Sequence, residues 1–124
     1  GKNMLIRYRK NLEKIAMGLL SLMPNEKEVK KLQATIKQYE AESNWQLFLW
    51  KEGEDIIGII GIMIEDDGTN SEIIIQHITV NPSFRHQGIG GKMVKQLKEI
   101  YKDKAMKATD ATSDFLNRCN IKEA

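Results

Sequence analysis

The apolar residues in the first third of this chain return every three or four positions, which is the spacing of one face of a helix. The pattern predicts two helices that pack on a core, and Pro24 separates them because proline cannot continue a helix. Asn25, with Glu28 three residues later, is the expected N-cap of the second helix. The predicted core residues are Leu12, Ile15, Ala16, Leu19, Leu20 and Met23 in the first helix and Val29, Leu32, Ile36 and Tyr39 in the second.

Runs rich in β-branched and aromatic residues predict strands at residues 4–8, 46–50, 56–64 and 72–80. Polar loops join the last three as antiparallel hairpins. Helical spacing then returns between Ile89 and Tyr101, and a short strand (residues 105–108) and a last helix (residues 112–119) complete the order β-α-α-β-β-β-α-β-α. We expect an α/β fold of the α+β type, with a mixed, mostly antiparallel sheet and helices on both of its faces.

Composition limits the partners. The chain carries 19 basic and 17 acidic side chains, a net charge of +2 spread over 124 residues, so we expect no one-signed face for nucleic acid or a membrane surface. The longest apolar run, residues 56–64, is too short to span a bilayer. One cysteine, Cys119, with two histidines far from it in sequence, gives neither an internal disulfide nor a metal site, which favours a cytoplasmic protein. We expect a single domain over residues 4–124, with residues 1–3 as a cloning remnant.

Residues 85–91, Arg-His-Gln-Gly-Ile-Gly-Gly, follow a strand that stops at Pro82 and precede a helix. The start of a helix leaves N–H groups without partners, and glycines expose the backbone there, so this turn is predicted to bind a phosphate or diphosphate. Two familiar phosphate loops do not fit the spacing. A Walker loop needs Gly where His86 stands, and the dinucleotide fingerprint needs a third Gly where Met93 stands.

The segment instead resembles the Arg/Gln-x-x-Gly-x-Gly/Ala signature of the GNAT family of N-acetyltransferases, and residues 78–82 before it suit that family too. The element order also resembles the family over nearly the whole chain, apart from two C-terminal strands that members usually add. The resemblance implies acetyl-CoA as cofactor and direct attack of a primary amine on the thioester. Within the family, residues 4–8 and 77–82 are similar to small acetyltransferases encoded in bacterial riboflavin operons, which implies an acceptor linked to riboflavin metabolism.

The resemblance also implies where the cofactor binds. Strand backbone would pair with the pantetheine arm, and N–H groups of the turn would hold the diphosphate, with Gly88 and Gly90 small so that it can approach. Arg85 would add a charge, unless it is an ordinary surface side chain, while His86 is expected to face solvent and Ile89 to enter the core. The implied cofactor-binding residues are Ile78, Thr79, Val80, Arg85, His86, Gln87, Gly88, Ile89, Gly90 and Gly91.

The catalytic groups depart from the family's usual pattern. The family's usual acid is a Tyr in the last helix, where this chain has Leu116, so the leaving thiolate would rely on solvent, Tyr101 or Cys119. A base matters more, because an amine (pKa about 10.4) holds its proton more tightly than a thiol (about 8.5). Glu72 and His77 are the candidates on the strand before the motif, and a bulge would bring both to one face. A solvated strand start for Glu72 and a packed strand residue for His77 stay open.

Three functions remain open from the sequence: an N-acetyltransferase for a small-molecule or protein amine, a catalytically silent acyl-CoA-binding regulatory or scaffold module, and a nucleotide-binding regulator. In the family the loop between the first two helices helps to build the acceptor pocket. Here Leu22, Met23 and Pro24 would give it an apolar wall, although ordinary helix termination also explains them. The sheet edge at residues 105–108 would allow a homodimer.

Overall fold

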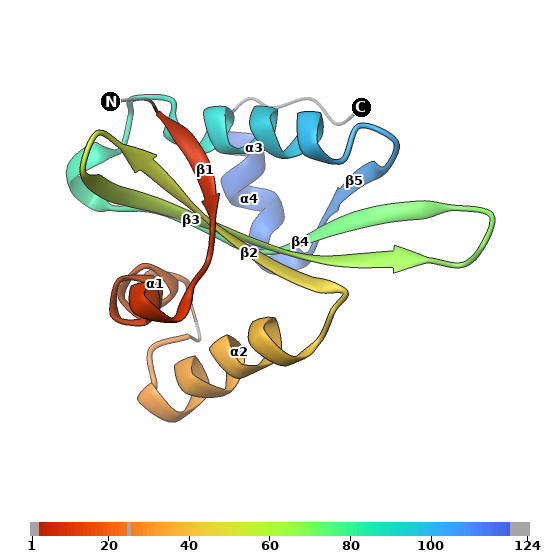
Figure 1. The fold of residues 1–124 in the computed structure, drawn as a ribbon. Helices are drawn as coiled ribbons and strands as arrows, with labels where there is room; N and C mark the ends of the chain where they lie inside the picture. The colour runs from red at the N-terminus through yellow and green to blue at the C-terminus, as the bar shows by residue number, and fades with distance from the viewer. Residues whose placement is uncertain (1–2, 25, 120–124) are drawn as a thin grey trace.

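The computed structural model describes residues 3–24 and 26–119. Figure 1 shows a five-stranded sheet with α1 and α2 on one face and α3 and α4 on the other. The strands are β1 (Met4–Arg7), β2 (Trp45–Glu52), β3 (Asp55–Asp66), β4 (Ser71–Val80) and β5 (Ala105–Ala108). The helices are α1 (Glu13–Leu20), α2 (Val29–Ala41), α3 (Ile89–Ile100) and α4 (Asp110–Arg118), with 3-10 turns η1 (Lys10–Leu12) and η2 (Pro82–Phe84). The predicted element order and fold class are confirmed.

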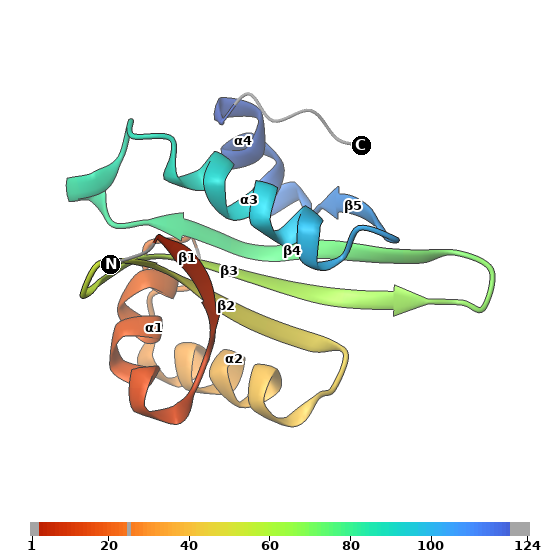
Figure 2. The same cartoon turned by 45° about the horizontal axis from the view of Figure 1, so that its top comes forward.

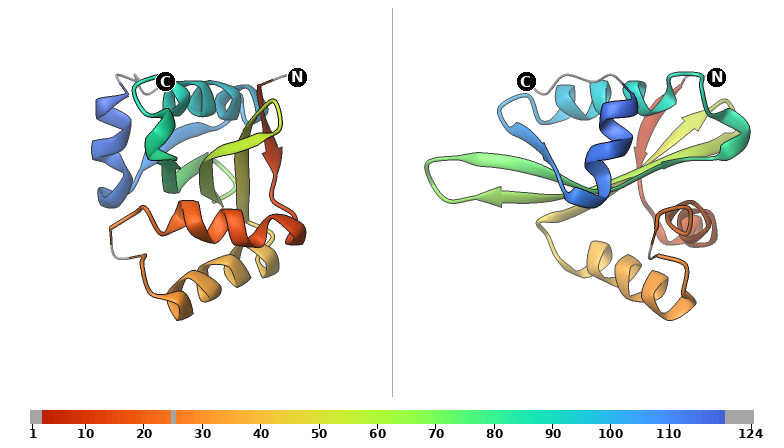
Figure 3. Two further views of the ribbon diagram at one scale, coloured as in Figure 1. Left: turned by 90° about the vertical axis from the view of Figure 1, so that its left-hand side faces the viewer. Right: turned by 180° about the vertical axis from the view of Figure 1, so that it is seen from behind.

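The strands lie in the order β1-β2-β3-β4-β5. Neighbours are antiparallel except β4 and β5, which are parallel, so the sheet is mixed and mostly antiparallel as predicted. The hairpin formed by β3 and β4 extends past the helices at one end of the molecule (Figure 3).

The sheet separates two apolar cores, and Figure 2 shows the helix pairs that cover them. On one face, Ala16, Leu20 and Ile36 of the first two helices pack on β2 and β3. On the other face, Met93 and Leu97 pack on isoleucines of β3 and β4. Each helix therefore contributes one apolar stripe to the core, which is the arrangement that the helical spacing predicts.

The prediction of a core position is wrong for two residues. Ile15 is 44% exposed and Val29 is 61% exposed. Ile15 stands next to the buried stripe of α1, about 100° around the helix from Ala16, and Val29 is the first residue of α2, ahead of the buried Leu32. The predicted N-cap Asn25 lies outside the described residues, and Glu28 occupies the N-cap position of α2 without a side-chain capping bond.

Strand β4 contains the bulge that the sequence analysis invoked. Gly61 pairs with His77 whereas Ile62 pairs with Ile75, so Gln76 is the extra residue. Ile75 and Ile78 both belong to the core under α3 and α4, although they are three residues apart. The bulge thus changes the phase of the strand, and His77 points instead toward α2.

Gly61 is a glycine because Tyr39 occupies the space above it. A Cβ atom at position 61 would overlap the Tyr39 hydroxyl and would lie 2.9 Å from its Cε1 atom. We expect Gly61→Ala to lower the free energy of unfolding by about 1–3 kcal/mol, the usual cost of overpacking, as measured by urea denaturation. Gly18→Ala is the control: it lies in α1 with open space around it, and should be neutral or stabilising by up to about 1 kcal/mol. Equal stability of both variants would contradict this packing.

Candidate cofactor and acceptor site

The turn between β4 and α3 has a backbone that requires glycine at one position. Asn81 accepts a hydrogen bond from the Ser83 N–H at 2.9 Å and starts η2. Positive φ angles follow at His86 (66°) and Gly88 (76°). Glycine adopts this left-handed region without a Cβ penalty, and Gly88 is the N-cap of α3. The helix begins at Ile89, so the glycine turn leads directly into it.

The first N–H groups of α3 are available to a ligand. The Lys92 N–H donates to the Gly88 carbonyl at 3.1 Å, so the N–H groups of Ile89, Gly90 and Gly91 precede this helical bond. The N-cap makes no side-chain hydrogen bond to them. Unpaired N–H groups and the positive end of the helix dipole are features that favour an anion, and the anion site itself stays a prediction from the motif.

The glycines of the motif have different surroundings. A Cβ at Gly90 would lie 2.7 Å from the Cys119 Sγ and 2.7 Å from a ring carbon of Phe115, so Gly90 lets α3 pack against α4. From the sequence, Gly90 was explained only by the approach of a diphosphate. Gly91, by contrast, has open space where a Cβ would stand.

A cavity of about 980 Å³ opens in front of this turn. The loop after α1, strand β4 with the turn that follows it, and α4 line this cavity. Of the predicted cofactor-binding residues, the cavity brings together Ile78, Thr79, Val80, Arg85, His86, Gly88, Ile89, Gly90 and Gly91. Gln87 is exposed and does not line it, and Ile89 also reaches the core as expected, with 2% exposure.

The edge of β4 is open where it meets the cavity. Pairing with β5 covers residues 72–75 of β4, and the Thr112 hydroxyl donates to the Ile75 carbonyl at 2.9 Å where the pairing ends. The Asn81 N–H bonds to Ile57 of β3 at 2.8 Å, so by antiparallel alternation the backbone groups of Val80 and Ile78 face away from β3. They can pair with an extended chain in the cavity, as an added strand would.

Charged side chains stand on both sides of the cavity. Arg85 donates from Nε to the Val80 carbonyl at 3.3 Å, which fixes its guanidinium beside the open strand edge. Across from it, α4 contributes Asp114, Phe115 and Arg118, and the Arg118 guanidinium lies 5.7 Å from the centre of the Phe115 ring. This wall was not predicted from the sequence, although positions 111, 114, 115 and 118 have the spacing of one helix face.

Neither predicted catalytic residue lines the cavity. The bulge does bring Glu72 and His77 to the same face of the sheet, the one covered by α1 and α2. Ile73 points to the opposite face, so its neighbour Glu72 points to this one. Glu72 lies where β4 still pairs with β5, and its Oε2 is 2.7 Å from the Lys107 Nζ. A role for Glu72 must therefore pass through water or require this ion pair to open.

His77 is a buried member of a polar chain. The Tyr39 hydroxyl is 2.5 Å from its Nδ1, and Glu26 Oε1 is 3.6 Å from its Nε2. Burial lowers the pKa of His77, and attraction to Glu26 partly offsets this. Burial also raises the pKa of Tyr39 well above its ordinary value, so the phenol keeps its proton and can donate it to Nδ1. The neutral imidazole then carries its own proton on Nε2, facing Glu26.

The residues considered as proton donors lie in different places. Leu116 is 5% exposed and belongs to the core, so the last helix offers no hydroxyl at that position. Tyr101 is the C-cap of α3, about 18 Å along the helix from the glycine turn, and it packs on Phe48. It is too far away to protonate a leaving group there. Cys119 lines the cavity, and burial raises its pKa, which keeps the thiol protonated.

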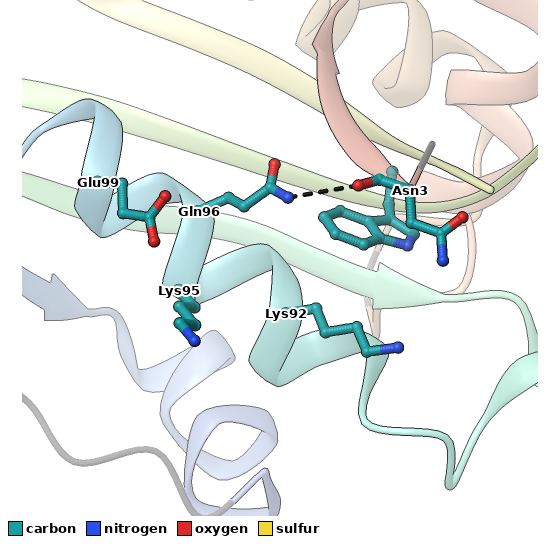
Figure 4. A pocket seen from close by; sticks show the side chains of 6 residues that line it. Asn3, Lys92, Lys95, Gln96 and Glu99 are labelled. Carbon is teal, nitrogen blue, oxygen red and sulfur yellow. Dashed lines mark hydrogen bonds between the residues drawn. The ribbon is translucent and has the colours of Figure 1, made fainter. Parts of the chain in front are cut away.

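A second, smaller cavity of about 330 Å³ lies on the outer side of α3. Figure 4 shows Gln96 reaching the Asn3 carbonyl, at 3.5 Å, with Lys92 and Lys95 on the same helix. It contains none of the predicted site residues. Within the described residues, no three His, Cys, Asp or Glu side chains gather in a way that could hold a metal ion. None of the helices in that part of the chain has the length and apolar character of a membrane crossing.

Comparison with known proteins identifies the family. The model of the acetyltransferase (GNAT) family matches residues 13–118. A relative described as an uncharacterized N-acetyltransferase in the lysA 3′ region of Bacillus methanolicus is 59% identical over 118 residues, or 95% of this chain and 96% of that protein. The chain therefore belongs to the GNAT acetyltransferase family.

Solved structures agree with this family at the level of the fold. A transcriptional regulator from Bacillus halodurans superposes with a TM-score of 0.75 at 16% identity, covering 98% of this chain and 93% of its own. The aminoglycoside N-acetyltransferase AAC(6′)-Iy in complex with CoA gives a TM-score of 0.76 at 14% identity, covering 99% and 90%. At these identities the similarity shows a shared fold.

The buried His77 predicts a pH-dependent stability. The unfolded chain binds a proton at His77 near its ordinary pKa of 6.5, whereas burial lowers the pKa in the folded chain. The folded state should thus be destabilised as the pH falls below about 6.5, until the folded pKa is also passed. Urea denaturation between about pH 7 and pH 5 should show this loss of unfolding free energy. The His77→Gln variant, which keeps Glu26, Lys31 and Tyr39, should not show the part of the loss that comes from His77. An unchanged pH dependence in the variant would contradict the assignment.

Proposed function

We propose that this chain transfers the acetyl group of acetyl-CoA to a primary amine. The observation that supports this proposal is that the unpaired N–H groups of α3 and the open edge of β4 share one cavity. The first suits a diphosphate and the second suits an amide-containing arm, and CoA carries both in series. The family membership and the CoA complex of AAC(6′)-Iy support the same cosubstrate.

The residues of the chain would divide the binding work. The N–H groups at Gly88 to Gly91 would hold the diphosphate, with the Arg85 guanidinium beside them. Backbone groups of Ile78 would pair with the pantetheine arm. The Val80 carbonyl accepts from Arg85, and the Val80 N–H would stabilise the oxyanion. When bound, acetyl-CoA supplies the activated thioester that the amine attacks directly.

The amine must lose a proton, which costs about 4.6 kcal/mol at pH 7 for an unperturbed pKa of about 10.4. Of the two candidates, His77 has both ring nitrogens directed at Tyr39 and Glu26. Glu72 has a carboxylate on the same face of the sheet, 23% exposed and balanced by Lys107. Glu72 lies eight residues before Val80, about 26 Å along the extended strand, which is too far for it to take the proton. We therefore propose that water takes the proton, with His77 in a supporting role.

The acceptor is proposed as a small-molecule or protein amine. Relatives of the same fold are described as aminoglycoside and glucosamine-6-phosphate N-acetyltransferases, which are enzymes for amines on sugar scaffolds. The link to riboflavin metabolism stays a prediction from residues 77–82. A cytoplasmic location agrees with the free thiol of Cys119, and a homodimer through the outer edge of β5 stays a prediction that sedimentation can test.

A catalytically silent acyl-CoA-binding module is the second candidate, because Leu116 stands where the family usually has its acid. Turnover separates the two. We expect purified protein with acetyl-CoA and a broad amine panel to release free thiol, and Glu72→Gln to leave kcat within about twofold of the parent. Tight CoA binding without turnover of any amine would favour the silent module. Thermal protection by ATP rather than by CoA would favour a nucleotide-binding regulator.

Gly91 offers a direct test of the diphosphate site. A carboxylate in the first turn is favourable for a helix but would compete with and repel a bound phosphate. We expect Gly91→Asp to weaken CoA binding at least about tenfold in calorimetry without lowering the melting temperature. Gly91→Ala adds bulk without charge into the same open space and should bind CoA nearly as the parent does. Unchanged affinity in Gly91→Asp would contradict the proposed site.

A further inference from the structure

The apolar wall at the acceptor end of the cavity is tied to β4 on both sides. Leu22, Met23 and Pro24 form this wall. Before them, the Thr79 hydroxyl donates to the Leu19 carbonyl at 2.8 Å. After them, Glu26 lies 3.6 Å from His77. Thr79 and His77 lie two residues apart in β4 and on the same face of the sheet. Their side chains therefore contact the chain just before and just after the wall.

We propose that the contact of Glu26 with His77 is a positioning link that sets how the amine acceptor is held against β4. This inference rests on the proposed function. The link joins the loop that carries the wall to the strand whose backbone would hold the thioester. Because the Glu26 N–H also donates to the Met23 carbonyl at 3.3 Å, a shift of Glu26 is transmitted to the wall.

The surroundings of Glu26 support a fixed position. Its side chain is 14% exposed, with Lys31 Nζ 3.8 Å from Oε1 and the Thr35 hydroxyl 3.5 Å from Oε2. Both partners belong to α2, so Glu26 connects that helix to β4. At 3.6 Å the contact with His77 is electrostatic rather than a hydrogen bond, and its strength depends on the direction of the imidazole.

Tyr39 fixes that direction. Its hydroxyl donates to Nδ1, and its ring packs edge-on against the imidazole with the centroids 5.5 Å apart. The Nε2 proton is thereby directed at Glu26. With Nδ1 accepting from Tyr39 and Nε2 donating toward Glu26, the imidazole has no lone pair left for the proton of an acceptor. His77 is therefore a positioning residue in this arrangement and not the base itself.

Two replacements of His77 separate these roles. The amide nitrogen of Gln reaches the place of Nε2 and keeps a donor toward Glu26, whereas the amide of Asn reaches only the place of Nδ1 and keeps a partner for Tyr39. We expect His77→Asn and Glu26→Ala to raise the KM for the amine at least about fivefold, with the affinity for CoA in calorimetry unchanged. His77→Gln should stay within about twofold of the parent. Glu40→Gln, which removes an exposed ion pair on α2, is the matched control and should change neither value.

Amide hydrogen exchange provides a readout that does not need turnover. The N–H groups of Leu22 and Met23 bond to Leu19 and Leu20 carbonyls within the tied segment. Their exchange should be faster in His77→Asn than in His77→Gln. Equal loss of kcat in both variants would overturn the inference in favour of an imidazole base, and unchanged KM and exchange in His77→Asn would also overturn it. If the parent binds CoA but acetylates no amine, the proposed function fails, and the exchange rates alone decide the link.

Discussion

The end of the pairing between β4 and β5 is the constraint on which the site depends. Up to Ile75 the two strands bond to each other, and Thr112 of α4 takes the carbonyl at that point. Beyond it, β4 continues with its outer backbone groups exposed to the cavity, while the chain turns at Gly88 into a helix with free N–H groups. Backbone donors and acceptors for a long extended ligand therefore lie along one continuous path.

The bulge at Gln76 gives the same strand two functions. Without it, strict alternation would place His77 on the face of Ile73 and Ile75, inside the core under α3 and α4. With it, His77 and Thr79 face α2 and α1, where they contact Tyr39 and Leu19. One inserted residue thus converts a strand that only packs into one that also contacts the loop between α1 and α2.

The sequence could predict the fold and the glycine turn before α3 because both depend on local patterns. Glycine spacing placed the turn, and periodicity placed the helices. The partners of His77 could not be predicted, since Tyr39 is 38 positions away and becomes a neighbour only through the packing of α2 on the sheet. Ile15 and Val29 were assigned to the core because spacing gives a face but not the width of the buried stripe. Gly90 fitted the signature, and only the position of α4 reveals its contact with Phe115.

The contact at Gly90 also sets a limit on how the cavity can change. Helices α3 and α4 enclose the cavity. They are in contact where Gly90 of α3, which has no side chain, faces Phe115 and Cys119. Their separation is thus fixed by a close contact whose residues also line the cavity. Replacing lining residues can alter the chemistry of the walls, but a wider channel for a bulkier acyl chain would require α4 to move as a whole.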